Sequence, residues 1–185
     1  ETCMNRTVEV AHLTDGDISV YDLDQAFFPI CNTKVAGTLV PVFSLRSKSS
    51  FGIGDFGDLK KMIDFVSQTG QRVLQILPIN DTTITHTWTD SYPYSCISIF
   101  AIHPQYADLN QLPAIADKAE AKKYEALRTK LNALSQIDYE AVNNAKTEYL
   151  KIIFEQEGKR IMASAEYKAF FEESQSWLVP YGHYC

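Results

Sequence analysis

Thr38-Leu39-Val40-Pro41-Val42-Phe43 and Arg72-Val73-Leu74-Gln75-Ile76-Leu77-Pro78, with the polar and helical residues between them, form the stretch that decides the fold. The first run is almost continuously apolar, as expected of a strand that is covered on both faces. Pro41 cannot donate to a ladder, so it indicates an edge, an end or a bulge in that strand. The second run predicts another buried strand.

A helix is expected between these two runs, because apolar residues recur at helical spacing along one face. These residues are Phe56, Leu59, Ile63 and Val66. Asp55 can cap the start of this helix, and Gly70 can end it. Residues 38–77 therefore predict one β-α-β unit with a right-handed crossover and parallel strands. Such a unit indicates an α/β architecture, either doubly wound or a barrel.

The residues before this unit have a different character. Residues 1–29 show the alternating pattern of short strands, as in Arg6-Thr7-Val8-Glu9-Val10, but contain too few strands to bury a face. We expect residues 1–36 to be the tail of a preceding β-rich module and a linker. The chain begins at Glu1 without a signal peptide and stops at Cys185 within an aromatic run, so it is interpreted as an excised segment.

The last third of the chain is rich in alanine, lysine and glutamate and predicts three amphipathic helices. The first spans about 115–134, and the others begin after Asp138 and near Ser164. Three helices in succession break the β-α alternation, so residues 113–185 are expected to be a helical insertion subdomain attached to residues 37–112. The residues expected to face inward are Val142, Ala145, Tyr149 and Ile152 on the second helix, and Tyr167, Phe170 or Phe171, and Trp177 on the third.

Composition and charge argue against several classes of function. The 185 residues carry a formal net charge of −6, so no basic field is present to bind nucleic acid. No apolar run approaches the roughly 20 residues that cross a bilayer, which argues against a membrane partner. The four cysteines and four histidines show no metal-ligand spacing, so no metal site is predicted. The scattered cysteines favour free thiols in a reducing compartment, which predicts a cytoplasmic protein.

A glycine motif suggests one alternative function. Gly52-Ile53-Gly54-Asp55-Phe56-Gly57 matches the pattern of dinucleotide-binding proteins, and the acidic Asp81 follows the next strand. In those proteins the first glycine ends the strand, whereas residues 44–51 intervene here. Asp55 and Asp58 would also place carboxylates where a pyrophosphate has to bind. A dinucleotide-binding oxidoreductase is therefore kept as a minor hypothesis, and glycines that let a loop fold back are preferred.

A loop after the second strand combines aromatic rings, hydroxyls and one carboxylate. Its sequence is Thr89-Asp90-Ser91-Tyr92-Pro93-Tyr94-Ser95-Cys96-Ile97-Ser98-Ile99-Phe100-Ala101. Flat rings beside polar groups suit a sugar, because a pyranose offers apolar faces for stacking and a rim of hydroxyls. Tyrosines that merely pack at the surface fit the same composition. From the residues alone, both interpretations stay open.

Four motifs carry a resemblance to a known family. They are Thr38-Leu39-Val40-Pro41-Val42-Phe43-Ser44, Phe51-Gly52-Ile53-Gly54-Asp55-Phe56-Gly57, Gln75-Ile76-Leu77-Pro78-Ile79 and Asp90-Ser91-Tyr92-Pro93-Tyr94-Ser95. In this order they closely resemble the amino-terminal part of the catalytic domain of the 4-α-glucanotransferases (amylomaltases or disproportionating enzymes, glycoside hydrolase family 77). The likeness is greatest to the large form in which starch-binding modules precede the barrel. The resemblance implies an interrupted (β/α)8 TIM barrel, of which this chain holds the first βαβ portion.

The resemblance also implies roles for three residues of the aromatic loop. Tyr94 would stack under the sugar at the cleavage point, and Ser91 would hydrogen bond a sugar just beyond it. Asp90 would either brace the loop or contact a hydroxyl. Tyr92 is inserted relative to the Asp-Ser-Pro-Tyr pattern of short members, which leaves the register of Ser91 open. His103 falls where short members tend to carry asparagine, and it is expected to support the loop.

The activity that the resemblance implies is transfer of α-1,4-glucan units between malto-oligosaccharides by a retaining covalent mechanism without a metal or organic cofactor. The catalytic carboxylates of the family belong to later barrel strands and are expected downstream of Cys185. The implied partners are malto-oligosaccharides, α-glucans and the rest of the parent polypeptide, and the segment alone is predicted to be inactive. A non-catalytic α-glucan-binding module is the main alternative.

Overall fold

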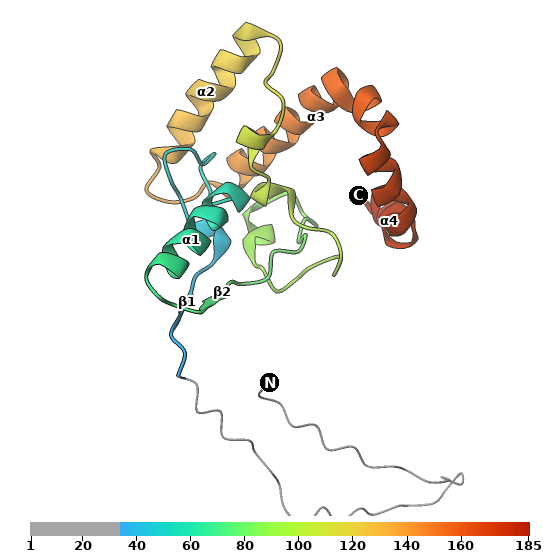
Figure 1. The fold of residues 1–185 in the computed structure, drawn as a ribbon. Coiled ribbons are helices and arrows are strands. Elements are labelled where there is room, and N and C mark those ends of the chain that lie inside the picture. The colour runs from blue at the N-terminus through green and yellow to red at the C-terminus, as the bar shows by residue number, and fades with distance from the viewer. Residues whose placement is uncertain (1–33) are drawn as a thin grey trace, which may run out of the picture. The chain divides into compact units, whose positions relative to one another are not determined.

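The computed structural model describes residues 34–185, so the predicted β-rich tail at residues 1–29 lies outside the described part. Residues Gly37–Cys185 form one compact unit. This unit contains all the helices and strands described below (Figure 1). Among its helices, none combines the length and the apolar composition that a membrane span needs.

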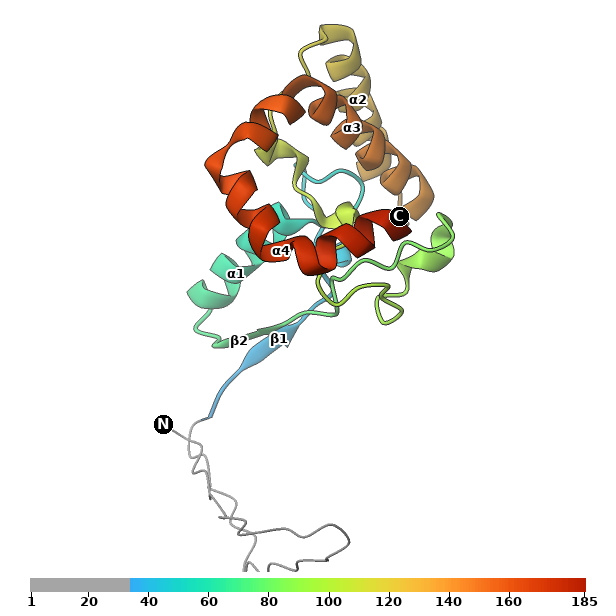
Figure 2. The same ribbon diagram turned by 90° about the vertical axis from the view of Figure 1, so that its right-hand side faces the viewer.

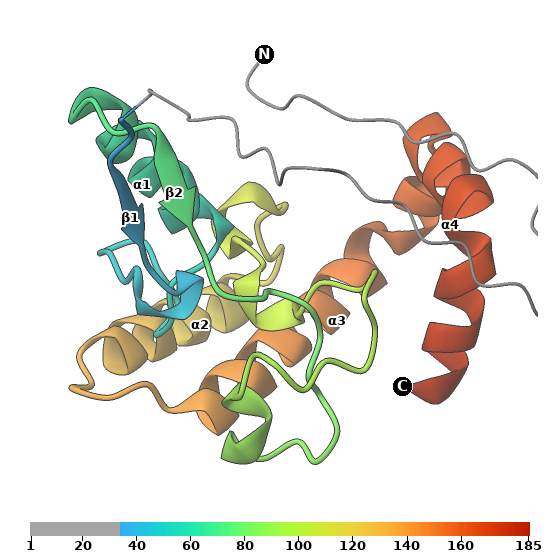
Figure 3. The same ribbon diagram turned by 90° about the horizontal axis from the view of Figure 1, so that it is seen from below.

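The predicted β-α-β unit is present. Strand β1 (Gly37–Leu39) pairs in parallel with strand β2 (Val73–Gln75), with Gly37 opposite Val73, and helix α1 (Phe56–Gln68) lies between them in the sequence. Figure 3 shows the two strands side by side. An α/β arrangement with a parallel strand pair is therefore confirmed.

Both strands are shorter than predicted. Strand β1 ends before Pro41, and Val42–Ser44 forms a single turn of 3-10 helix instead of continuing the strand to Phe43. The reason is local, because proline has no N–H group to donate to the ladder. The ladder ends with the hydrogen bond of 2.9 Å from the Val40 N–H to the Gln75 carbonyl.

Helix α1 starts and stops where the sequence predicts. Asp55 caps it by accepting hydrogen bonds from the N–H groups of Gly57 (2.9 Å) and Asp58 (3.2 Å), in a capping box with Asp58. Gly70 follows the helix with a φ of 74°, the left-handed conformation that glycine adopts without strain. The predicted apolar stripe is only partly covered, because a sheet of two strands is narrower than the helix face, and Ile63 is 51% exposed.

Three further helices complete the unit, as the sequence predicts: α2 (Lys118–Asn132), α3 (Tyr139–Ala163) and α4 (Ala165–Tyr184). Each begins with a side-chain cap, supplied by Asp117, Asp138 and Ser164 respectively. Ser164 ends α3 and caps α4, so the two helices follow each other directly and change direction there (Figures 1 and 2).

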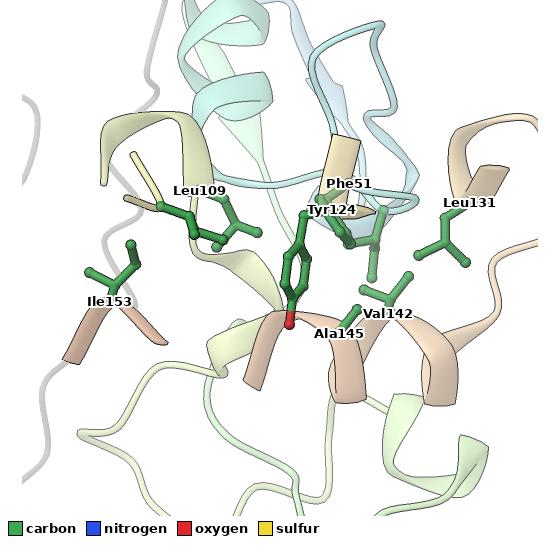
Figure 4. Close-up of a cluster of buried hydrophobic side chains, with 9 residues drawn as sticks. Phe51, Leu109, Tyr124, Leu131, Val142, Ala145 and Ile153 are labelled. Atoms are coloured by element: carbon green, nitrogen blue, oxygen red, sulfur yellow. The ribbon is translucent and has the colours of Figure 1, made fainter. Parts of the chain in front are cut away.

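One buried core joins α2 and α3 to the loop before α1 and to residues 109–115. Its residues are Phe51, Ile53, Leu109, Ile115, Tyr124, Leu131, Val142, Ala145 and Ile153. Figure 4 shows the Tyr124 ring pointing from α2 towards α3, close to Ala145. The core therefore crosses the expected boundary between residues 112 and 113, and residues 37–185 pack as one compact unit. Whether 113–185 arose as an insertion stays a prediction.

Helix α4 is only partly packed. Trp177 is half-buried and its ring stacks on that of Phe100, with centroids 5.6 Å apart, and Tyr167 is also half-buried. The expectation that Phe170 or Phe171 faces inward is wrong, since they are 48% and 38% exposed. Helix α4 packs against α3, stacks Trp177 on Phe100, and reaches Asp81 through the Tyr181 hydroxyl.

Candidate functional site

A cavity of about 770 Å³ lies between the loop after β2, helix α3 and the end of α4. Its lining is rich in polar and charged groups. The side chains that give it this character are Asp81, Thr83, Asp90, His103, Asn143, Lys146, Glu148, Lys151 and Tyr181. A hollow of this size and chemistry is suited to a polar small molecule such as a sugar.

Asp90 anchors the loop that forms one wall of the cavity. Its buried carboxylate accepts hydrogen bonds from the N–H groups of Ile84 (3.1 Å), Thr85 (3.1 Å) and His86 (2.8 Å). The Thr85 hydroxyl donates to the same carboxylate at 2.9 Å. His86 has a φ of 57°, a left-handed backbone conformation that is costly for residues other than glycine. Of the two roles predicted for Asp90, the structure displays the bracing one.

The ionised form of Asp90 is the one that this arrangement stabilises. Burial raises the pKa of the Asp90 carboxyl, but the hydrogen bonds from Thr85, Ile84 and His86 outweigh burial and lower the pKa below its usual value. Asp90 is therefore a charged acceptor at neutral pH, and its oxygens are already occupied by protein donors.

A second network crosses the cavity from the loop to α4. The Asp81 carboxylate accepts hydrogen bonds from the Tyr181 hydroxyl, the Thr83 N–H (2.9 Å) and the Thr83 hydroxyl (2.7 Å). Asp81 itself is 2% exposed. Thr83 lies in the same loop as Asp81, so the Tyr181 hydroxyl is the donor that joins the end of α4 to the loop after β2.

His103 lies beside Thr83 of the Asp81 network. Its Nδ1 accepts a hydrogen bond of 3.1 Å from the Gln105 N–H, which leaves the proton on Nε2, 3.5 Å from the Thr83 hydroxyl oxygen. Burial lowers the pKa of His103, although the charges of Asp81 and Asp90 oppose this effect. The neutral imidazole caps the 3-10 turn Pro104–Tyr106, and its expected support of the aromatic loop stays a prediction.

Lys146 is the most deeply buried charge of the site, at 1% exposure. Its Nζ donates to the carbonyl oxygens of Gln105 (2.6 Å) and Ala107 (2.8 Å) and lies 3.9 Å from a carboxylate oxygen of Asp55. Burial lowers the pKa of Lys146 to about 8 and raises that of Asp55 to about 6, and each charge partly offsets the shift of the other. Lys146 thus ties α3 to the cap of α1 and to the turn that carries His103.

The structure separates the three predicted site residues. Asp90 lines the cavity, whereas Ser91 and Tyr94 do not. Ser91 is half-buried at the end of the 3-10 turn Trp88–Ser91, and Tyr94 is 60% exposed with its ring 5.5 Å from that of Tyr92. Tyr92 and Tyr94 therefore present a pair of open aromatic rings within four residues of Asp90 in the sequence, and their sugar contacts stay a prediction.

Protein groups fill the space around the glycine motif. A Cβ at Gly54 would lie 2.0 Å from the Val42 carbonyl oxygen, and a Cβ at Gly52, where φ is 77°, would lie 2.7 Å from Cβ of Leu131. The N-terminus of α1 is filled by the buried carboxylates of Asp55 and Asp58. A pyrophosphate would be repelled there, so these glycines serve close packing. Within residues 34–185, no cluster of three or more side chains suited to a metal ion occurs.

Sequence reasoning missed Lys146, and it considered Asp81 only for the glycine motif. The signal for Lys146 was present, because it lies four residues after Val142 and three before Tyr149, on the apolar stripe of α3. A lysine at such a position has to be paired when it is buried. The contact between Asp81 and Tyr181 joins residues 100 positions apart and leaves no local signal.

Comparison with known proteins gives a consistent result. The sequence pattern of glycoside hydrolase family 77, described as 4-alpha-glucanotransferase, matches residues 40–185. The chain is 38% identical over 150 residues to the 4-alpha-glucanotransferase DPE2 of Oryza sativa subsp. japonica, which covers 81% of the chain and 16% of that relative. It is 35% identical to the 4-alpha-glucanotransferase of Chlamydia muridarum over 80% of the chain and 28% of that relative.

A 4-alpha-glucanotransferase of Synechocystis is 30% identical over 80% of the chain and 28% of its own length. The chain therefore spans less than a third of each of these three relatives. The family match nevertheless covers both the β-α-β unit from residue 40 onward and the three helices. On this evidence the chain belongs to glycoside hydrolase family 77, the 4-alpha-glucanotransferases.

Proposed function

We propose that this chain is a segment of a 4-α-glucanotransferase that transfers α-1,4-glucan units between malto-oligosaccharides or longer glucans such as starch or glycogen. The observation that carries this proposal is the family match over residues 40–185, together with relatives that bear this name. The reaction is a retaining one, in which a carboxylate attacks the anomeric carbon and a glucan hydroxyl then displaces the enzyme.

The segment contributes substrate contacts and leaves the covalent chemistry to other parts of the parent protein. Its buried carboxylates support this division, because protein donors already occupy them. The buried aspartates that accept at least two such hydrogen bonds are Asp55, Asp58, Asp81 and Asp90. A carboxylate held in this way is a poor nucleophile. The isolated segment is therefore expected to be inactive.

The first β-α-β portion of a (β/α)8 barrel is the architecture that we assign to residues 37–112. The support is the parallel pairing of β1 and β2, because loops after parallel strands emerge at the same edge of the sheet. Residues 40–55 and 76–101 are the loops that follow β1 and β2. The cavity wall at Asp90 belongs to the second of these loops, at the edge where barrel enzymes build their sites.

The aromatic loop is assigned to the glucan. The Tyr94 ring stacks on a sugar face, Ser91 hydrogen bonds the neighbouring sugar, and Asp90 holds the loop in shape. The exposed rings of Tyr92 and Tyr94, close in the sequence to Asp90 of the cavity wall, support this assignment. The free thiols of Cys96 and Cys185 support a reducing compartment, and we place the parent protein in the cytoplasm.

The proposal is tested with the full-length protein that contains this chain, incubated with maltotriose. Appearance of glucose together with malto-oligosaccharides longer than maltotriose is the expected result. Binding of maltotriose without any product would instead identify a non-catalytic α-glucan-binding module. Transfer by the isolated 185 residues would contradict the division of roles stated above.

A further inference from the structure

A groove of about 370 Å³ runs along α3 beside the cavity. The two hollows share Pro104, Thr147 and Lys151 in their linings, so the groove is continuous with the cavity. Leu150 and Phe154 form its apolar floor, and Glu155 lies at its far end. Leu150, Phe154 and Glu155 line only the groove, and they follow Thr147 along one side of α3.

Phe154 is unusual in this groove because it is 59% exposed, although it is a large apolar residue on a well-formed helix. Its ring lies against Gly158, which is buried. A Cβ at position 158 would be only 2.9 Å from two carbons of the ring. A side chain at position 158 would therefore have to displace the ring from its place against α3.

Gly158 is costly to the helix itself, since glycine is among the weakest helix formers and lies here in the interior of α3. The three atoms nearest to a Cβ at this position all belong to the exposed Phe154 ring, which is outside the buried hydrophobic core. A flat aromatic face that is held open beside Lys151 and Glu155 has the make-up of a sugar platform, with an apolar face for C–H groups and charged acceptors and donors for hydroxyls.

We propose that Phe154 is the stacking platform of an accessory α-glucan subsite, and that the groove along α3 carries a longer glucan to it from the cavity. This inference rests on the proposed function and adds a second contact region to it. From Asn143, at the far end of the cavity lining on α3, to Phe154 the helix rises by roughly 16 Å, so a single sugar bound at the Asn143 end does not reach the platform. Long glucans span both regions, whereas short ones depend on the cavity end alone.

Three substitutions at Phe154 test the platform in the full-length protein. Phe154→Tyr keeps a flat ring, Phe154→Leu keeps apolar bulk without a flat face, and Phe154→Ala removes both. Relative to wild type, the leucine and alanine variants should raise KM for glycogen by roughly three- to tenfold, whereas the tyrosine variant should not. KM and kcat for maltotriose should stay unchanged in all three variants.

A fourth variant separates stacking from protein packing. Gly158→Ala should raise the melting temperature, because alanine favours the helix, and yet weaken glycogen binding, because the new methyl group displaces the ring. If Phe154 instead packs against another part of the parent polypeptide, Phe154→Ala lowers the melting temperature and affects both substrates equally, and Phe154→Leu is tolerated. That outcome overturns the inference.

The outcomes also separate the inference from the proposed function. Wild-type protein that produces nothing from maltotriose contradicts the proposed function. Wild-type protein that is active on maltotriose, with unchanged glycogen KM in Phe154→Ala and Gly158→Ala, leaves the proposed function intact and overturns the subsite.

Discussion

Replacement of Asp90 by asparagine is the perturbation that the structure predicts most sharply. The carboxylate of Asp90 accepts the N–H groups of Ile84, Thr85 and His86, and it is 7% exposed. Asp90→Asn keeps the size and one acceptor oxygen but removes the charge, and it turns an NH2 group towards donors. The side chain at position 90 should therefore bind these three backbone N–H groups much more weakly.

The magnitude follows from the change of acceptor. A hydrogen bond to a charged group contributes about 1.5–3 kcal/mol and a neutral one about 0.5–1.5 kcal/mol, so each of the three backbone bonds loses about 1 kcal/mol. Because the bonds share one carboxylate they are not additive, and a total loss of about 2 kcal/mol is expected. That loss corresponds to roughly 30-fold faster opening of the loop.

Hydrogen–deuterium exchange read by mass spectrometry measures this opening directly. A peptide that contains residues 84–90 should exchange roughly 30-fold faster in Asp90→Asn than in wild type, whereas peptides from α1 should be unchanged. Asp64→Asn is the matched control, because Asp64 is exposed on α1 and undergoes the same chemical change. Equal exchange of the 84–90 peptide in wild type and Asp90→Asn would refute the bracing role.

The pH dependence gives an independent check on the same residue. The hydrogen bonds lower the pKa of folded Asp90 below its unfolded value of 3.8, so the stability it contributes is present above that value. It is lost as the pH falls through the lower folded pKa. The difference in unfolding free energy between wild type and Asp90→Asn should therefore be constant at neutral pH and shrink towards zero in acid.

Three further results are expected. Tyr94→Ala should cost glucan transfer by the full-length protein about 1–3 kcal/mol of transition-state stabilisation, because stacking is lost. It should change the unfolding free energy by less than about 0.5 kcal/mol, since Tyr94 is 60% exposed. Unchanged kinetics would remove Tyr94 from the site. Tyr181→Phe should lower the unfolding free energy, measured by urea denaturation, by about 1.5–3 kcal/mol, because it removes a donor to the buried Asp81 carboxylate; an unchanged unfolding free energy would show that this bond contributes nothing. The pKa of Lys146 is about 8 in the folded protein and 10.5 in the unfolded chain. As the pH rises between these values, the unfolding free energy of wild type should therefore increase by about 3 kcal/mol relative to that of Lys146→Met. A difference in unfolding free energy between the two proteins that does not change with pH would contradict the burial of a charged lysine.

Local sequence signals predicted the elements well. Asp55 and Gly70 are a capping acid and a left-handed glycine, and both act within a few residues, so α1 was placed correctly. The parallel pairing of β1 and β2 followed from two apolar runs on either side of that helix. Pro41 was recognised as a problem for the first strand, and the strand does end before it.

Tertiary contacts were beyond the reach of these signals. Phe170 and Phe171 fit an inward stripe by spacing, but of that stripe only Tyr167 and Trp177 are half-buried, and Phe100 covers Trp177 alone. Lys146 was hidden because a charge on an apolar stripe is placed by its partners, two carbonyl groups and Asp55, which come from elsewhere in the sequence. The cavity at Asp90 depends on these same long-range contacts.

The central claim is that the loop after β2 and the adjacent cavity contact α-glucan. Hydrogen–deuterium exchange of the full-length protein with and without maltoheptaose tests it most directly, with a nicotinamide dinucleotide as the comparison ligand. We predict that maltoheptaose slows exchange in peptides covering residues 84–101, and that the dinucleotide changes nothing there. Protection of the glycine loop at residues 51–58 by the dinucleotide, with no effect of maltoheptaose on residues 84–101, would contradict the account.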